Sequence, residues 1–266
     1  MAREPTPDTN PVTSTATASG RSTVYSPRGT AATSHPLATG AALEILAAGG
    51  NAVDGAVAAG LTLGVVNGYN SGIGGGCFMV IRLANGKFMV IDGREMAPAA
   101  AKRDMYIRNG KPDTSASKVG ALASGVPGAL AAYEMAVRQH GKLPIKWHLE
   151  NAAKIAENGF KIPSAYAGRI RATSRDLRKF KDSATILLDK NGKSLKSGEL
   201  LKQPDLAKTY RAIAKEGIGW FYGGPFAAVT EKWMKANGGI MTARDLANYR
   251  PKLRAPVRVK YRGCEI

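Results

Sequence analysis

Arg94 and Glu95 are the side chains best placed for chemistry, in the stretch IDGREMAP that begins at Ile91. Arg94 directly follows a run of bulky apolar residues, so a strand should fix its backbone. Its guanidinium offers a planar set of N–H donors that fits a carboxylate in two-point contact. Two roles are open at this stage: a clamp for a substrate carboxylate, or a structural ion pair with Asp92 or Glu95. The neighbouring residues alone favour the ion pair.

The sequence contains no other recognised catalytic pattern. Its three histidines, His35, His140 and His148, form no i, i+4 pair, and no acidic cluster accompanies them. A shared metal is therefore not expected. There is no G-x-S-x-G turn of the kind that carries the serine of α/β-hydrolases. The residues by themselves identify no nucleophile.

A glycine run, Gly74-Gly75-Gly76, lies just before the apolar residues that lead to Arg94. A phosphate-binding glycine loop opens a helix, whose free N–H groups face the anion. Here the glycines open a strand, and Asn85-Gly86 then favours a type I′ hairpin turn into a second strand over residues 87–92. Neither nucleotide-binding spacing is present, so no cofactor is expected. We expect the glycines to let the backbone pass close to another element or a ligand.

The rest of the chain must position this hairpin, and its pattern is mostly helical. Asn51 should cap a buried helix over 52–66, with Asp54 near the positive end of its dipole. A short strand and turn are expected around Asn191-Gly192. The last residues, with Val257 and Tyr261 alternating with charged side chains, predict a half-buried strand. The other expected helices cover about 36–48, 127–140, 145–158, 163–181, 203–216, 225–237 and 242–249.

The net charge of +18 is unevenly distributed. The first 100 residues contain six basic and six acidic side chains, so the whole excess lies in the later part. Its densest run, Gly168 to Asp182, holds six basic and two acidic side chains. A polyanion-binding surface and a solvated helix surface would both fit this run. Because the only aromatic residue in it is Phe180, nucleic-acid binding is not expected.

Composition also limits the location of the protein and its redox chemistry. Residues 1–28 are rich in Pro, Ser, Thr and Ala, which predicts a disordered tail. They lack the apolar segment of a secretory signal, so a cytoplasmic location is the default expectation. No stretch reaches the roughly 20 apolar residues of a membrane span. Cys77 and Cys264 have no metal or redox spacing, which favours two buried thiols and leaves a disulfide open.

Several separate motifs together resemble one family, the γ-glutamyltransferases, also called γ-glutamyl transpeptidases or glutathione hydrolases. They occur in the order typical of that family, and the resemblance runs from about Gly29 to Ile266. The motifs are SHPLATGAALEILAAGGNAVDGAVAAGLTLGVV, SGIGGGCFMV, DGREMAPAAA, ASGVPGALAAYEMAVRQHG and GGIMTARDLANYR.

The resemblance implies an α+β fold, the four-layer αββα sandwich of the Ntn hydrolases, with residues 29–266 as a portion of the large subunit. In this family a precursor cleaves itself, and the new N-terminal Thr of the small subunit attacks the γ-glutamyl amide. Glutathione would be the substrate, and the small subunit of the same precursor the partner. Arg94 matches the arginine that holds the α-carboxylate of the γ-glutamyl group, and Glu95 is the adjacent supporting acid. The resemblance thus reverses the local preference for an ion pair.

The resemblance also leaves questions open. Relatives that act as β-lactam side-chain acylases share these motifs, so the substrate is not settled by them. The family continues far beyond a strand like VRVKYRGCEI, through the cleavage site and the nucleophilic Thr. We therefore expect no catalytic residue within residues 1–266, and a sheet edge that the full protein would pair. An inactive truncated member and a polyanion-binding protein are the alternatives, and the resemblance also allows a periplasmic or secreted location.

Overall fold

The computed structural model describes residues 24–27 and 29–266. The predicted tail, residues 1–28, lies almost entirely outside the described residues, so its disorder stays a prediction. The chain divides into two units, Met1–Thr30 and Ala31–Ile266, and the second contains all the helices and strands described below. None of the helices in the described part is long and apolar enough to cross a membrane.

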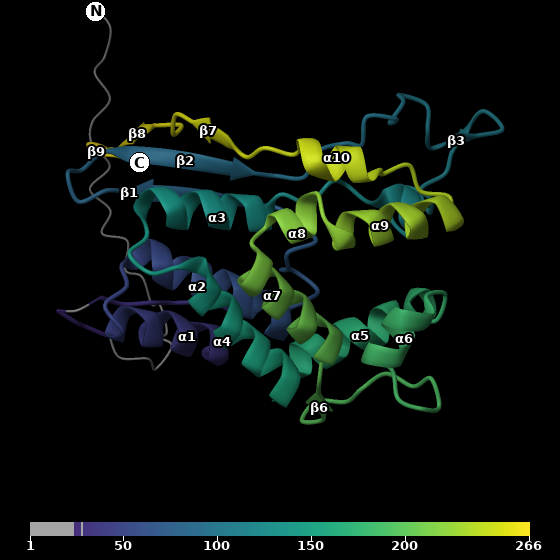
Figure 1. The fold of residues 1–266 in the computed structure, drawn as a ribbon, viewed down its shortest axis with the longest axis horizontal. Helices are drawn as coiled ribbons and strands as arrows, with labels where there is room; N and C mark the ends of the chain where they lie inside the picture. The colour runs from purple at the N-terminus through teal and green to yellow at the C-terminus, as the bar shows by residue number, and fades with distance from the viewer. Residues whose placement is uncertain (1–23, 28) are drawn as a thin grey trace, which may run out of the picture. The chain divides into compact units, whose positions relative to one another are not determined.

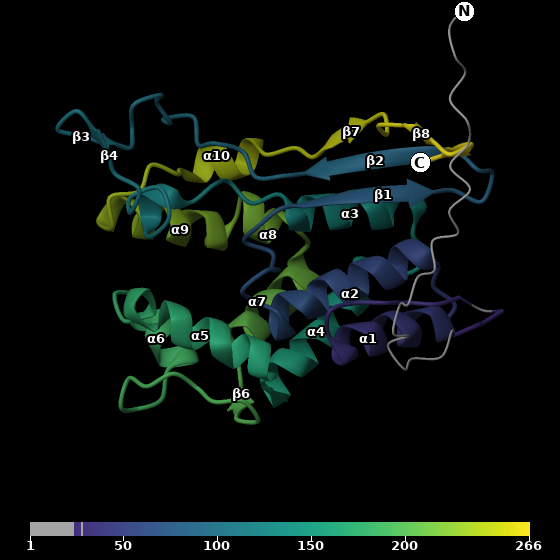
Figure 2. The same ribbon diagram turned by 180° about the vertical axis from the view of Figure 1, so that it is seen from behind.

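A three-stranded antiparallel sheet of order β1-β2-β7 lies on one side of the second unit. It consists of β1 (Cys77–Arg82), β2 (Phe88–Gly93) and β7 (Lys252–Arg254). In β1 and β2, Cys77 pairs with Gly93, and Asp92 of β2 pairs with Lys252 of β7. Figure 1 and Figure 2 show α3 (Ala129–His140) running along one face of the hairpin. The sheet therefore joins strands about 160 residues apart in the chain and has helices on one of its faces.

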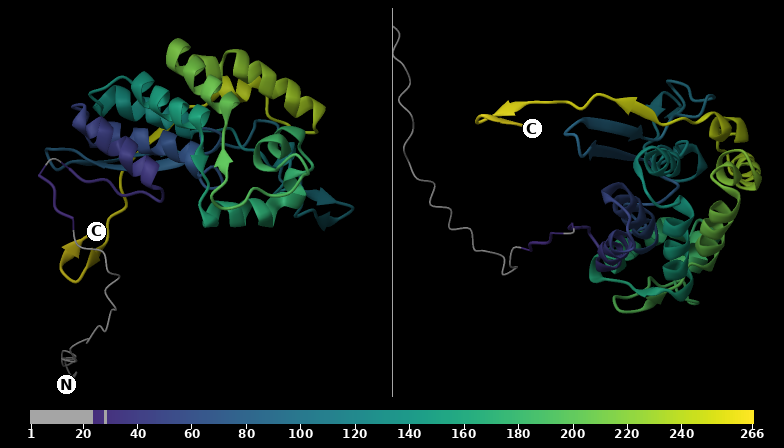
Figure 3. Two further views of the ribbon diagram at one scale, coloured as in Figure 1. Left: turned by 90° about the horizontal axis from the view of Figure 1, so that it is seen from below. Right: turned by 60° about the vertical axis from the view of Figure 1, so that its left-hand side comes forward.

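The helices form a thick body below the sheet, seen from two further sides in Figure 3. Three two-stranded sheets and one 3-10 turn, Ala121–Ala123, complete the fold. Two of them are hairpins, β3 (Ile107–Arg108) with β4 (Lys111–Pro112) and β8 (Lys260–Tyr261) with β9 (Cys264–Glu265), and the third pairs β5 (Phe160–Lys161) with β6 (Leu200–Leu201) across α5 and α6. The remaining helices are α1 (Pro36–Ala47), α2 (Ala52–Val66), α4 (Ile145–Asn158), α5 (Ser164–Leu177), α6 (Lys181–Leu187), α7 (Pro204–Glu216), α8 (Gly219–Tyr222), α9 (Pro225–Ala236) and α10 (Ala243–Asn248).

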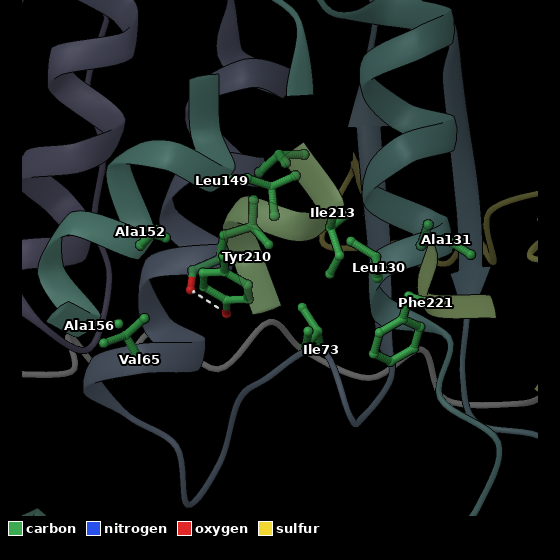
Figure 4. Close-up of a cluster of buried hydrophobic side chains, with 14 of the residues drawn as sticks. Val65, Ile73, Leu130, Ala131, Leu149, Ala152, Ala156, Tyr210, Ile213 and Phe221 are labelled. Carbon is green, nitrogen blue, oxygen red and sulfur yellow. Dashed lines mark hydrogen bonds between the residues drawn. The ribbon is translucent and has the colours of Figure 1, made fainter. Parts of the chain in front are cut away.

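The core lies where α2, α4 and α7 meet and extends toward α3 and α8 (Figure 4). Helix α7 turns Ala207, Tyr210 and Ile213 inward, a three-residue spacing that places them on one face. Tyr210 is fully buried, and its hydroxyl donates to the carbonyl oxygen of Leu61 on α2 at 3.1 Å. This bond satisfies the polar end of a large buried ring, as buried tyrosines require.

The start of α2 is fixed by Asn51 and Asp54, as their spacing predicts. The Asn51 side chain accepts from the backbone N–H groups of Val53 and Asp54, and Asp54 accepts in return from the N–H of Asn51. Asp54 is also fully buried and accepts from the N–H groups of Lys142 at 2.9 Å and Leu143 at 3.3 Å. Burial raises the pKa of Asp54, but the backbone donors outweigh it and hold the pKa below its usual value. One carboxylate therefore joins the start of α2 to the loop between α3 and α4.

His148 of α4 lies beside Asp54 and is also fully buried, with its Nε2 3.4 Å from Asp54 Oδ1. Neither ring nitrogen has a hydrogen-bond partner within the described part of the chain. Burial lowers the pKa of His148, opposed by the charge of Asp54. The folded chain therefore holds a neutral imidazole over a pH range in which the unfolded chain binds a proton.

The free energy of unfolding of this chain is expected to fall as the pH drops below about 6.5, the ordinary pKa of histidine. In that range the unfolded state binds more protons at His148 than the folded state does, so acid favours unfolding. Denaturant unfolding at pH 7.5 and at pH 5 gives the free energy of unfolding at each pH. The decrease between the two pH values should be smaller for His148→Gln than for the unchanged chain. Equal drops would contradict the argument.

The structure confirms most of the predicted helices and corrects four details. The hairpin loop is not a type I′ turn: Gly86 alone takes a positive φ, of 82°, and the N–H of Gly86 donates to Leu83, so three residues connect Leu83 to Lys87. The expected helix over 163–181 ends at Leu177, and α6 begins at Lys181. The short helix α8 was not predicted. Leu188 and Ser194 form only an isolated bridge around the predicted turn.

The predictions for the last residues are wrong. Val257 and Tyr261 are 90% and 59% exposed, and the segment forms only the short β8–β9 hairpin. Alternation produces a half-buried strand only where a sheet is present to receive it, and β8 pairs with β9 alone.

The prediction of two buried thiols is wrong as well, because Cys264 is exposed and Cys77 is partly buried. Both cysteines are free, so the disulfide that was left open does not form.

Candidate substrate-binding site

Arg94 leaves the end of β2 with both of its backbone groups held by side chains. Its N–H donates to Asp92 Oδ1 at 3.0 Å, and its carbonyl oxygen accepts from the hydroxyl of Tyr249 at 2.8 Å. The next residues stay in place because Met96 and Val126 exchange two backbone hydrogen bonds. The strand that the apolar residues predict therefore ends at a firmly anchored arginine.

Asp92 is paired with Arg254 and not with Arg94. Arg254 Nε donates to Asp92 Oδ2 at 2.5 Å, across the β2–β7 pairing. The N–H of Arg94 and the Arg254 guanidinium hold the pKa of Asp92 below its usual value. The carboxylate is thus charged at neutral pH and has a donor on each oxygen. Of the two predicted ion-pair partners for Arg94, Asp92 is already occupied.

The guanidinium of Arg94 lies near Glu95, the other predicted partner. Arg94 Nη2 is 3.3 Å from Glu95 Oε2, and the two side chains are 57% and 31% exposed. A pair this exposed contributes at most about 1 kcal/mol to stability. The structural ion pair is therefore present but weak, and more than half of the Arg94 side chain faces solvent. That leaves guanidinium donors free to bind a carboxylate from outside.

The glycine run packs against this turn. The carbonyl oxygen of Gly75 accepts from the N–H groups of Gly128 at 2.9 Å and Ala129 at 3.0 Å, at the start of α3. A Cβ on Gly76 would lie 2.7 Å from both Glu95 Oε2 and the carbonyl oxygen of Gly93. Gly76 thus allows close approach of backbone, one of the two roles that the sequence predicts for the glycine run.

Two residues of the site, Tyr249 and Arg254, had no predicted role. Tyr249 is 4% exposed and its ring stacks on Tyr222, with centroids 5.9 Å apart and planes at 15°. Burial raises the pKa of Tyr249 to about 12, so its hydroxyl remains a donor at neutral pH. Both residues lie more than 150 positions from Arg94. No local pattern in the sequence indicates that they meet it.

Other chemistry is limited in the described part of the chain. No group of three or more His, Cys, Asp or Glu side chains there could hold a metal ion. Burial, with the charge of Glu95, raises the pKa of Cys77 to about 11, so this cysteine is a thiol and not a reactive thiolate at neutral pH. The arrangement can bind a carboxylate, and none of the groups around Arg94 is an activated nucleophile.

Comparison with known proteins gives consistent matches. The family model for γ-glutamyltranspeptidase matches residues 38–266. The glutathione hydrolase proenzyme of Escherichia coli (strain K12) is 38% identical over 91% of this chain, and the acylase ACY 1 proenzyme of Pseudomonas sp. (strain SE83) is 41% identical over 90%. The chain spans only 42% and 44% of the length of these two relatives.

Solved structures agree with the sequence matches. The crystal structure of Helicobacter pylori γ-glutamyltranspeptidase superposes with a TM-score of 0.89 and 39% identity, over 92% of this chain and 70% of that one. The γ-glutamyltranspeptidase from Pseudomonas nitroreducens gives a TM-score of 0.84 and 37% identity, over 91% of this chain and 71% of that one. The α+β fold, the turn that carries Arg94 and the helices beneath it all lie within the matched region, and the chain therefore belongs to the γ-glutamyltranspeptidase family.

Proposed function

We propose that this chain supplies the carboxylate-binding half of a γ-glutamyl-transferring enzyme, with Arg94 as the clamp for the α-carboxylate of the γ-glutamyl group. One observation carries the proposal: the backbone of Arg94 is anchored at both ends while its guanidinium is largely exposed. An arginine fixed in this way suits two-point binding of a carboxylate. Glu95, 3.3 Å from the guanidinium, would support its orientation.

The clamp would work with a nucleophile contributed by the small subunit of the same precursor. The proenzyme names of the relatives support such a precursor. The N-terminal Thr of that subunit would attack the γ-carbonyl of glutathione or a related amide, with its own amino group as general base. Water or an amino acid would then take the γ-glutamyl group from the acyl-enzyme. Arg94 would contribute by holding the donor so that the γ-carbonyl faces the hydroxyl.

The sheet has a free face that suits the four-layer sandwich of the family. Phe78, Val80 and Phe88 of the β1–β2 hairpin are 60%, 68% and 39% exposed, on the face away from α3. Apolar side chains gathered on one sheet face usually pack against another layer. We infer that a second sheet, with strands from the rest of the precursor, covers these residues.

Arg94→Ala in the complete precursor tests the clamp. We expect kcat/KM for a γ-glutamyl anilide to fall about 30-fold, or about 2 kcal/mol, because a charge-assisted pair is lost. The same donor with its α-carboxylate converted to an amide should be a poor substrate of the unchanged enzyme. Arg94→Ala should not lower kcat/KM for this amide any further. Arg103→Ala, whose side chain is 94% exposed, is the matched control and should leave both rates unchanged. An equal loss for both donors in Arg94→Ala would remove Arg94 from carboxylate binding.

A side-chain acylase is the second candidate, favoured by the 41% identity to the acylase ACY 1 proenzyme. A glutaryl amide has a terminal carboxylate at the same position as the α-carboxylate of a γ-glutamyl amide and lacks only the amino group. Arg94 would serve either donor, so the arginine does not separate the two activities. Comparing kcat/KM for γ-glutamyl and glutaryl anilides does: a preference for the glutaryl compound would assign the acylase activity.

A further inference from the structure

Two side chains of the short segment from Tyr249 to Arg254 hold the backbone N–H and carbonyl groups of Arg94, one directly and one through Asp92. Tyr249 donates to the carbonyl oxygen of Arg94, and Arg254 holds the carboxylate of Asp92 that accepts from the N–H of Arg94. Both peptide groups of one residue are therefore fixed, directly or through Asp92, by side chains from a segment more than 150 positions away. Backbone groups at the end of a strand need such partners where the ladder no longer pairs them.

The hydroxyl of Tyr249 is itself held in a fixed position. Its ring stacks on Tyr222, whose own hydroxyl donates to the carbonyl oxygen of Pro127 at 3.0 Å and accepts from the N–H of Ala131 at 3.2 Å. Tyr222 thereby ties the stacked pair to the start of α3. This packing restricts the movement of the Tyr249 ring relative to α3.

Gly128 provides the space that this hydrogen bond needs. A Cβ on Gly128 would overlap the hydroxyl oxygen of Tyr249 and the carbonyl oxygen of Gly93. With no side chain there, the tyrosine reaches the turn that carries Arg94. The hydrogen bond from Tyr249 to Arg94 therefore depends on the close packing of three segments, those that contain Gly93, Gly128 and Tyr249.

The second interaction that holds Arg94 is the ion pair between Arg254 and Asp92. Arg254 lies opposite Val90 in the β2–β7 pairing, from where its Nε reaches Asp92. The Arg254 side chain is 54% exposed and that of Asp92 only 11%. Without Arg254, Asp92 would keep one backbone donor and lose its only ion-pair partner within the described residues.

We propose that Tyr249 and, through Asp92, Arg254 are positioning residues for donor binding: they fix the backbone of Arg94 so that its guanidinium meets the substrate carboxylate. This proposal rests on the function proposed for Arg94 and adds residues that determine donor affinity. A displacement of the anchor of about 1 Å is enough to misalign a two-point contact. Because Arg94 would contact the donor carboxylate and not the reacting amide, we expect these residues to change donor binding more than the chemical step.

Tyr249→Phe in the complete precursor is the test, because it removes one hydroxyl and keeps the stacked ring. We expect KM for the γ-glutamyl anilide to rise about three- to tenfold, the effect of one lost hydrogen bond, with kcat nearly unchanged. The α-carboxamide donor should show no change. Arg254→Gln, on a half-exposed side chain whose loss should not unfold the protein, is expected to raise KM in the same way.

Two controls separate positioning from general loss of structure. Tyr210→Phe removes a buried hydroxyl that donates to the backbone carbonyl of Leu61 on α2 and not to the turn that carries Arg94, so it should lower Tm without changing KM. In an Arg94→Ala background, Tyr249→Phe should add no further effect on KM. The proposal is overturned if neither Tyr249→Phe nor Arg254→Gln raises KM in folded enzyme, or if the Tyr249→Phe effect persists without Arg94. If Arg94→Ala itself fails to distinguish the two donors, the proposed function is the claim that falls.

Discussion

Asp54→Ala is expected to lower the free energy of unfolding of this chain by about 3 kcal/mol, the scale for leaving several backbone donors unsatisfied. Asp54 is fully buried and accepts from three backbone N–H groups, those of Asn51, Lys142 and Leu143. Alanine would remove the Asp54 half of the capping box of α2, leaving the Asn51 half, together with the tie between α2 and the loop before α4. Water cannot easily replace the carboxylate at a position without exposed surface. Chemical denaturation followed by circular dichroism gives the value directly.

Asp176→Ala is the matched control for this prediction. It also deletes a helix carboxylate, in the last turn of α5, but the Asp176 side chain is 44% exposed and its ion-pair partner is Lys179, just beyond the end of the helix. Surface pairs of this kind contribute well under 1 kcal/mol, so the variant should unfold within about 0.5 kcal/mol of the unchanged chain. Similar losses in the two variants would mean that the backbone hydrogen bonds of Asp54 do not stabilise the fold as argued.

The contrast between local and long-range information explains what the sequence could predict. Asn51 and Asp54 were predicted as a cap because their spacing alone determines that geometry. The contacts of Asp54 with Lys142 and Leu143 were not predicted, because no residue near Asp54 in the sequence indicates which loop it contacts. The burial of Asp54 results from the packing of the whole fold and not from the sequence around the start of α2.

The same limit applies at the candidate site. Arg94 was placed at the end of a strand from the apolar residues before it, and the structure confirms that position. Tyr249 and Arg254 were missed because a hydrogen bond across 155 or more positions leaves no periodic signal. The family resemblance could point to Arg94 and Glu95 because they match a motif. The side chains that hold them in place became visible only in the fold.

The end of the chain shows the opposite error. Alternating apolar and charged residues predicted a half-buried strand at Val257 and Tyr261, and both are exposed. Alternation describes a strand with one face against a sheet, and the described part of the chain provides no such sheet there. Together with exposed Phe78 and Val80, these residues fit a surface that would be covered in the four-layer sandwich inferred above.

Gly76→Val should be among the most damaging single substitutions near the site, destabilising the chain by about 3 kcal/mol, at the upper end of the usual cost of overpacking. A Cβ at Gly76 would lie 2.7 Å from Glu95 Oε2 and 2.9 Å from the Cα of Arg94, and the β2 backbone is held by strands on both sides. Any relief must therefore displace the clamp, so donor use in the complete precursor should fall at least as far as in Arg94→Ala.

Gly74→Val provides the control within the same loop. A Cβ at Gly74 meets no atom within 4 Å, so this variant should keep its Tm within a few degrees and its KM for the γ-glutamyl anilide. Measuring Tm and KM for both variants separates two explanations of the glycine run. Damage confined to Gly76→Val means that the run exists to let the backbone approach Arg94 and Glu95. Equal damage in both would mean that the loop itself contacts the substrate, and the role argued here for Gly76 would be wrong.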